Sequence, residues 1–132
     1  MGGTNLKKIG TFGEKIAEKY LKKNGFKILE KNYSLKFTSG PIPGEIDLIA
    51  QKKDTIHFIE VKTSLQDYSQ KKQQIPPEER VNYSKQKKLI KMAESWLMKR
   101  KIPLNSKWQI DVISIKIDLK KYKARIRYFS NI

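Results

Sequence analysis

The spacing of apolar residues divides this chain into helical and extended segments. Apolar positions recur at helical intervals in residues 11–24 and 82–101, with lysines on the opposite side of each segment. The segments that alternate or run apolar as strands do are 26–37, 45–51, 55–63, 108–117 and 123–129. The pattern predicts one α/β domain over residues 1–132 with the element order αβββαββ.

The first helix is predicted to start at Thr11, because Thr11 and Glu14 have the spacing of a capping box. Its expected apolar face consists of Phe12, Ile16, Ala17, Tyr20 and Leu21. The expected apolar face of the second helix consists of Leu89, Ile90, Ala93, Trp96 and Leu97.

The connections add three expectations. Residues 52–54 form a short turn, so the strands on either side of it should pair as a hairpin. Residues 64–81 are polar and contain Pro76-Pro77, which favours a long exposed loop. Residues 1–8 are polar, which favours a flexible start without a secretory signal. In the second half of the chain, 108–117 is expected to be a central strand and 123–129 an edge strand.

Charge and composition narrow the function. Lys plus Arg exceeds Asp plus Glu by 29 − 13 = +16, which favours a polyanionic partner, nucleic acid first, over an anionic membrane surface. The chain has no Cys and one His, so cysteine zinc sites and disulfides are excluded. Any metal would be held by carboxylates, as Mg²⁺ or Mn²⁺ is. No apolar stretch is long enough to span a bilayer, so the expected location is cytoplasmic.

Candidate chemistry lies in the predicted hairpin. Side chains alternate along a strand, so Glu60 and Lys62 should share a face, with His57 on the other. If the two strands of the hairpin pair in register, Asp47 would face Glu60. Two carboxylates this close repel each other unless a proton or a cation lies between them. An ordinary salt bridge is the alternative. Glu14, at the margin of the first helix's apolar face, is a fourth candidate, or only a capping residue.

These residues give the chain a resemblance to a known superfamily. It resembles the PD-(D/E)xK nucleases, and more closely the YraN-like family of predicted endonucleases, which is similar to archaeal Holliday junction resolvases. The matching pieces are Gly10–Glu14 with Ala17 and Tyr20-Leu21, Gly25-Phe26, Asn32, Gly44–Ala50 and Phe58–Lys62.

The resemblance implies a restriction-endonuclease-like fold, a three-layer α/β/α arrangement with a mixed central sheet. It implies metal binding by Asp47, Glu60 and the Val61 carbonyl, a catalytic role for Lys62, and a supporting acidic role for Glu14. Around them, Glu45, Gln86 and Asp111 are candidate supporting residues. Gln86 is equally well explained as a packed polar core residue, and Asp111 as a structural carboxylate whose partner stays open.

The expected function is a Mg²⁺-dependent endonuclease acting on DNA in preference to RNA, and selective for structure. Branched or junction DNA and a homodimer are favoured by the resemblance alone. The alternatives are a noncatalytic nucleic-acid-binding protein that keeps the nuclease fold and an RNA-associated basic protein. The candidate phosphate contacts are Lys71, Lys72, Arg80, Lys85, Lys87 and Lys88.

Overall fold

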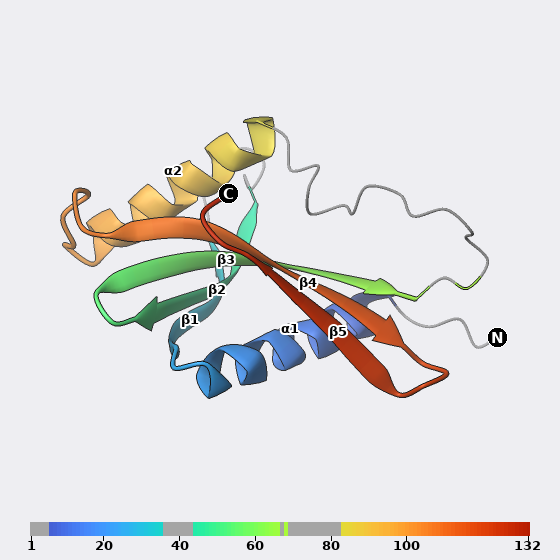
Figure 1. Cartoon of the computed structure of the whole chain (residues 1–132). Helices are drawn as coiled ribbons and strands as arrows, with labels where there is room; N and C mark the ends of the chain where they lie inside the picture. Colours follow the sequence, from blue (N-terminus) through green and yellow to red (C-terminus); the bar gives the residue numbers. More distant parts are fainter. Residues whose placement is uncertain (1–5, 36–43, 67, 69–82) are drawn as a thin grey trace.

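The computed structural model describes residues 6–35, 44–66, 68 and 83–132, which form a mixed five-stranded sheet and two helices (Figure 1). The elements are α1 (Leu6–Lys23), β1 (Lys27–Ser34), β2 (Glu45–Lys52), β3 (Thr55–Leu65), α2 (Tyr83–Lys99), β4 (Trp108–Asp118) and β5 (Lys123–Phe129). The predicted α/β class and element order are confirmed. The strands follow one another across the sheet in chain order, and only the β3–β4 pair is parallel.

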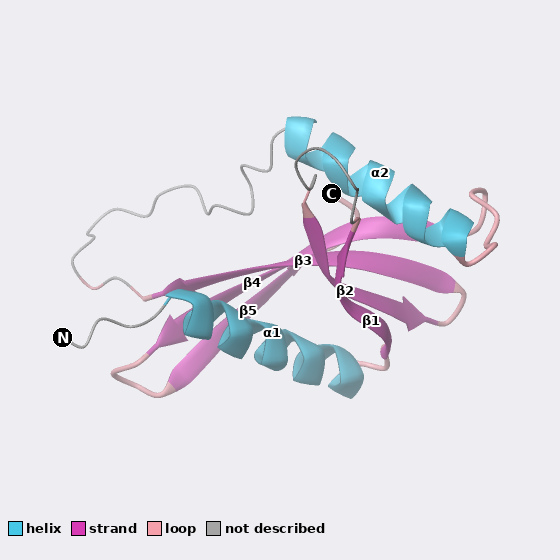
Figure 2. Ribbon diagram, turned by 180° about the vertical axis from the view of Figure 1, so that it is seen from behind, coloured by secondary structure: helices cyan, strands magenta, loops and turns pink. Residues whose placement is uncertain are grey.

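The two helices pack on opposite faces of the sheet (Figures 1 and 2). On one face, Ala17 and Leu21 of α1 pack against a cluster that includes Leu48, Ile59 and Ile113. On the other face, Trp96 and its neighbours on α2 pack in a cluster with residues of β1, β2, β3 and early β4. We call these the α1 face and the α2 face.

Helix α1 begins five residues before the predicted Thr11, so Thr11 and Glu14 lie inside the helix and form no capping box. The buried stripe of α1 runs Ile9, Gly13, Ala17 and Leu21, and burying Ile9 offsets the helix penalty of about 1 kcal/mol at Gly10. Phe12 lies outside this stripe and is exposed, contrary to the expected apolar face.

Other boundaries move by a few residues. Strand β1 starts at Lys27 and ends at Ser34, and α2 ends two residues before Lys101. On α2 the expected core residue Ile90 is exposed, and Met92 is buried in its place. Within the described sheet, β4 is an interior strand between β3 and β5, although the middle strand is β3, and the predicted edge position of β5 is confirmed.

Strand β3 is longer than its apolar pattern indicated. Its parallel pairing with β4 continues to Leu65, which lies opposite Ile117, so residues 64 and 65 belong to the strand and not to the predicted loop. Most of the remaining segment, 67 and 69–82, lies outside the described residues, as do residues 1–5. Neither described helix is long and apolar enough to cross a membrane.

Candidate functional site

The candidate site starts from a break in strand alternation at Asp47. Ile46 and Ile49 pack on the α2 face while Leu48 and Ala50 pack on the α1 face, so strict alternation fails between them. Opposite this point, Asn32 of β1 has a φ of 53°, in the left-handed region that Asn tolerates. The local irregularity turns Asp47 toward α1, on the opposite face from Ile49, where uniform alternation had placed the two together.

Asp47 meets two other carboxylates on this face. One ligand oxygen from each of Glu14, Glu45 and Asp47 lies within 4.8 Å of the others. Glu14 comes from α1, and Glu45 and Asp47 from the start of β2. The three residues line one surface hollow together with Asn32 and Val61. We call this hollow the acidic pocket.

Polar contacts orient the carboxylates of the acidic pocket. The N–H of Val61 donates to Asp47 Oδ2 at 2.7 Å, just past the last β2–β3 pair, Leu48 with Ile59. With its amide nitrogen turned toward the carboxylates, Asn32 donates to Glu45 at 2.9 Å and to Glu14 at 3.0 Å. These donors hold the ligand oxygens in place and lower the cost of gathering like charges.

The electrostatics of the pocket favour a bound cation or proton. Burial raises the pKa of Asp47 to about 7, the Val61 N–H opposes the rise, and the charges of Glu14, Glu60 and Glu45 add to it. Burial also raises the pKa of Glu14; a hydrogen bond with Asp47 lowers it, and the charge of Glu45 raises it. A divalent cation that shares these oxygens would relieve both effects.

The ligand set fits a hard divalent cation. Mg²⁺ and Mn²⁺ prefer carboxylate oxygens, and oxygens that share one such ion lie a few ångströms apart, as these do. Glu14, Glu45 and Asp47 would hold the ion. The structure thus makes Glu45 a candidate ligand, which the sequence suggested only as a supporting residue.

Close approach of α1 to β3 brings Glu14 into the pocket. A Cβ atom at Gly13 would stand 1.9 Å from Thr63 Oγ1, so the helix can lie at this distance only with glycine there. Glu14, the next residue, is thereby carried toward Asp47.

Glu60 lies on the other side of the sheet. It shares the α2 face with Phe58 and lines a second hollow, in which Lys85 Nζ is 2.5 Å from Glu60 Oε1. Glu45 lines both hollows. The expected Asp47–Glu60 facing pair is therefore divided, because the break at Asn32 and Asp47 turns Asp47 toward α1.

Glu60 nevertheless retains a feature typical of a ligand. Its Oε2 is buried and has no hydrogen-bond partner within the part of the chain that the structure describes. Its charge acts on Asp47, which places the two carboxylates within electrostatic range. Lys62 lies two residues further along β3, opposite Ser114 of β4 in the parallel register, and is half-buried.

The other predicted residues are distributed as follows. Lys85 and Lys88 line the hollow of Glu60, Lys87 is exposed on α2, and Gln86 is half-buried and lines neither of the two hollows. Lys71, Lys72 and Arg80 lie outside the described residues. Val61 belongs to the acidic pocket, where its N–H contacts Asp47, and metal binding by its carbonyl stays a prediction.

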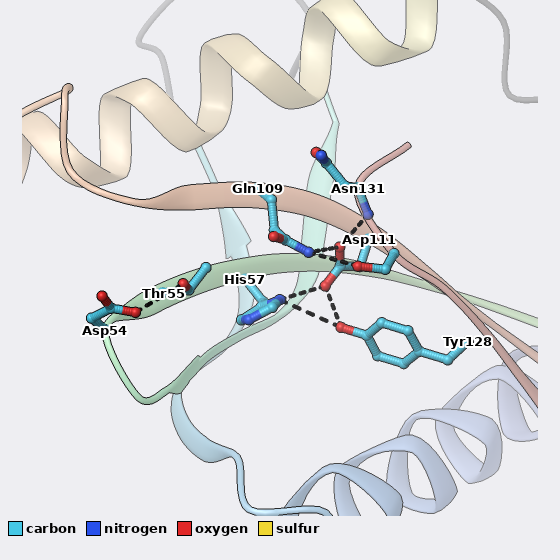
Figure 3. A network of polar contacts seen from close by, with 8 residues as sticks. Asp54, Thr55, His57, Gln109, Asp111, Tyr128 and Asn131 are labelled. Carbon is cyan, nitrogen blue, oxygen red and sulfur yellow. Dashed lines mark hydrogen bonds and ion pairs between the residues drawn. The ribbon is translucent and has the colours of Figure 1, made fainter.

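Asp111 has its own partners, away from the acidic pocket (Figure 3). It is fully buried, and His57 Nδ1 lies 2.6 Å from its Oδ2. The Tyr128 hydroxyl donates to the same oxygen, and Gln109 Nε2 and the Asn131 N–H donate to Oδ1 at 2.8 and 2.7 Å. The partner that the sequence left open is this network, which ties together β3, β4, β5 and the C-terminal segment.

Sequence reasoning missed two contacts. Asn32 was part of the family resemblance but received no role; an Asn in the middle of a strand is an unfavourable strand residue, and that was the available signal. The Lys85–Glu60 ion pair joins residues 25 positions apart on different elements, and no local pattern indicates it.

Comparison with known proteins identifies relatives. The family described as "Uncharacterised protein family UPF0102" matches residues 13–115. A UPF0102 protein of Campylobacter fetus subsp. fetus is 39% identical over 119 residues, 90% of this chain and 93% of its own. One from Alkaliphilus oremlandii is 39% identical over 119 residues, 89% and 92% of the two chains, and one from Clostridium botulinum is 37% identical over 126 residues, 95% and 93%.

Proposed function

Because the chain belongs to the UPF0102 family, whose name assigns no activity, we propose its function from the site: a divalent-metal-dependent endonuclease acting on DNA. The observation that carries the proposal is the acidic pocket. Three carboxylates from separate positions converge there, beside the strand that bears Glu60 and Lys62, in a chain of net charge +16. In a highly basic protein, several acidic side chains that lie close together indicate a cation-binding site. The excess of basic residues elsewhere would favour binding of a phosphate backbone.

Each residue has a chemical part in this proposal. Glu14, Glu45 and Asp47 hold the ion, and Asn32 and the Val61 N–H orient them. A bound Mg²⁺ or Mn²⁺ supplies a Lewis acid and lowers the pKa of water in the site. Lys62 lies on the α2 face, so its part in the proposal requires the phosphate to bind at the gap where β2 and β3 separate, where Glu45 lines the hollows of both faces. There the positive charge of Lys62 would offset negative charge that builds up in the transition state.

Glu60 is the residue whose part depends on substrate. Its Oε1 is bound by Lys85, while its buried Oε2 remains available to accept a proton or a water hydrogen bond. When a phosphate approaches, Lys85 can turn from Glu60 to the phosphate, which would release the carboxylate for the reaction.

The fold supports the same reaction class. A mixed sheet with a helix on each face, and acids at the point where β2 and β3 separate, is the arrangement expected of the restriction-endonuclease-like fold and of resolvase-like relatives. We assign the protein to that fold class as part of the proposal. None of the described helices and strands is an element dedicated to reading bases, which favours selection of DNA by structure, with branched DNA first.

The test is cleavage of labelled junction, flap and linear duplex DNA in Mg²⁺ or Mn²⁺. Wild type should cleave at least one substrate, and Asp47→Asn and Lys62→Ala should each lower the rate by roughly 100-fold or more. Matched controls are Asp54→Asn and Lys53→Ala in the exposed β2–β3 turn, which should cleave like wild type.

Metal binding gives a second readout. Calorimetric titration with Mn²⁺ should detect a site in wild type and in Lys62→Ala, and no site in Asp47→Asn. Wild-type cleavage no greater than that of Asp47→Asn, on every substrate and with both metals, would refute the enzyme proposal.

One observation favours a second candidate, a noncatalytic DNA-binding protein with this fold. The Lys85–Glu60 ion pair neutralises a carboxylate that a nuclease would use. That function predicts steeply salt-dependent DNA binding that is unchanged in Asp47→Asn and Glu60→Gln, with no cleavage and no Mn²⁺ site.

A further inference from the structure

Part of the α2 face of the sheet is not covered by α2. The buried residues of α2 pack over β1, β2, the first half of β3 and Ile110 at the start of β4. Beyond that point β3, β4 and β5 continue past the helix (Figure 1). On this part of the face Ser64, Lys116 and Arg125 are exposed, so within the described residues the sheet is open to solvent there.

Strand register determines which side chains share this open surface. Lys62 of β3 lies opposite Ser114 of β4, which lies opposite Arg127 of β5. In the next row Ser64 lies opposite Lys116, which lies opposite Arg125. Residues paired across strands point to the same face, and Phe58 fixes that face as the α2 face, with Glu60 and Lys62 on it.

The alternate residues of β4 and β5, which point to the α1 side, support this assignment of faces. Ile113, Ile115, Ile117, Ile126 and Tyr128 are the residues of β4 and β5 that pack in the α1-side cluster. The alternate positions of these strands, among them Lys116, Lys123, Arg125 and Arg127, must therefore point away from α1.

The resulting surface is cationic and includes Lys62, which shares the α2 face with Glu60 and its hollow. We define the basic face as Lys62, Lys116, Lys123, Arg125 and Arg127. Among the described residues, the carboxylates that share this part of the sheet are Glu60, bound by Lys85, and Asp118, which accepts hydrogen bonds from the Tyr68 hydroxyl and from the N–H groups of Lys120 and Lys121. In this described set the cations outnumber the acids, and each acid already has a bonded partner.

The spacing of the basic face suits a linear polyanion. Alternate residues of β5 stand about 7 Å apart, and neighbouring strands about 5 Å apart, so the charges form rows along and across the sheet. The Arg127 guanidinium lies over the ring of Phe129, 5.1 Å from its centroid, and this contact holds the side chain against the sheet.

We infer that the basic face is the DNA-binding platform of this protein, holding the phosphate backbone across β3, β4 and β5 and leading it to Lys62. This inference deepens the proposed function, on which it rests for the choice of DNA as polyanion. It locates the main contacts on β4 and β5, away from the loop and helix lysines that the sequence indicated. A competing explanation is that basic residues on β5 only prevent edge-to-edge strand pairing.

The test is binding of a labelled DNA junction and a duplex in EDTA, followed by fluorescence anisotropy, so that cleavage plays no part. The variant is Lys116→Gln with Arg125→Gln and Arg127→Gln. Its matched control is Lys15→Gln with Lys19→Gln and Lys23→Gln. These substitutions replace three exposed lysines of α1 and remove the same charge from the opposite face of the sheet.

The basic-face variant should bind at least about 30-fold more weakly than wild type at 100 mM salt. The slope of its log K against log salt should be less steep by about 2 to 3 units, as expected for three lost phosphate contacts. The α1 control should lose less than about 3-fold. Equal losses in the two variants, or no loss in the first, would overturn the inference, as would a loss for anionic phosphatidylglycerol vesicles without a loss for DNA.

A measurement on the unaltered protein protects the test against misfolding of the variant. Bound DNA should shield Lys116 and Lys123 from acetylation at least about 5-fold more than it shields Lys15 and Lys19, and equal shielding would overturn the inference. Binding is measured without divalent metal, so the two hypotheses can fail separately. Wild-type protein that binds DNA on this face but never cleaves it would refute the proposed nuclease activity and leave the DNA-binding platform supported. Metal-dependent cleavage with undiminished binding by the basic-face variant would refute the platform alone.

Discussion

At the scale of single residues, Asp47 is the residue on which the site depends. Its carboxylate is oriented by the Val61 N–H, lies beside Glu14 and Glu45, and is acted on by the charge of Glu60 from the other face. Burial and these charges raise its pKa to about 7, so without a cation the folded protein binds a proton that the unfolded chain has already released. A carboxyl group in this environment lowers the free energy of unfolding near neutral pH. A functional role, and not a contribution to stability, explains such a residue.

This cost predicts a pH-dependent effect of Asp47→Asn in metal-free protein. A raised carboxyl pKa means that the native state binds more protons than the unfolded state between about pH 4 and 7, so stability falls as pH rises through that window. The substitution should therefore raise the free energy of unfolding at pH 8 by roughly 1–3 kcal/mol and change it little at pH 4.

Urea unfolding in EDTA at the two pH values measures this effect. Added Mn²⁺ should stabilise wild type at pH 8 and leave Asp47→Asn unchanged. A substitution that destabilises equally at both pH values would contradict the assignment.

At the scale of elements, the contact between α1 and β3 sets the depth of the acidic pocket. Gly13 faces Thr63 so closely that no side chain fits between them, and Glu14 follows directly. The packing of a helix on a strand thus determines where a ligand oxygen stands. Gly10, one turn earlier, has nothing within 4 Å of where its Cβ would be.

The two glycines give opposite predictions. Gly13→Ala should cost roughly 2–4 kcal/mol of stability, because overpacking pushes α1 away from Thr63, and it should weaken Mn²⁺ binding by moving Glu14. Gly10→Ala should gain roughly 0.5–1 kcal/mol from helix propensity and leave Mn²⁺ binding unchanged. Denaturant unfolding and metal titration of both variants measure these effects; similar behaviour of the two would show that the close contact is not decisive.

At the scale of the whole molecule, a buried polar network joins the three strands that carry the basic face. Asp111 of β4 receives donors from Gln109, Tyr128 and Asn131 and pairs with His57 of β3. Burial and the Asp111 bond raise the pKa of the Tyr128 hydroxyl, so it remains protonated and can donate. The network joins the central strands to the edge strand and to the chain end without touching the acidic pocket.

Replacing Asp111 should therefore affect stability more than site chemistry. Asp111→Asn should cost roughly 2–4 kcal/mol, since it replaces a charged acceptor and leaves buried donors poorly matched. Asp54→Asn, which removes an ion pair that is exposed on both sides, should cost less than about 1 kcal/mol. Thermal unfolding compares them; at a temperature where Asp111→Asn is folded, its Mn²⁺ affinity should match that of wild type, and a lost metal site would make Asp111 part of the pocket.

Local pattern predicted much of the fold correctly. The hairpin of β2 and β3, the shared face of Glu60 and Lys62, and the edge position of β5 all follow from periods and turn residues near each other in the chain. Errors arose where distant partners intervened: buried Ile9 extended α1, and pairing with β4 extended β3 to Leu65.

By itself, the sequence determined which residues carry charge and how they are spaced along each element, and so it indicated acids on β2 and β3 and a polyanion for a partner. Only the tertiary structure decided which acids meet. The left-handed backbone at Asn32 and the break beside Asp47 turned that carboxylate to Glu14 and Glu45, while Glu60 stayed with Lys85 on the other face. The face to which a strand side chain points depends on the backbone angles of the residues around it and on the packing that stabilises those angles. One irregular residue changes this face without changing the apolar periodicity of the sequence.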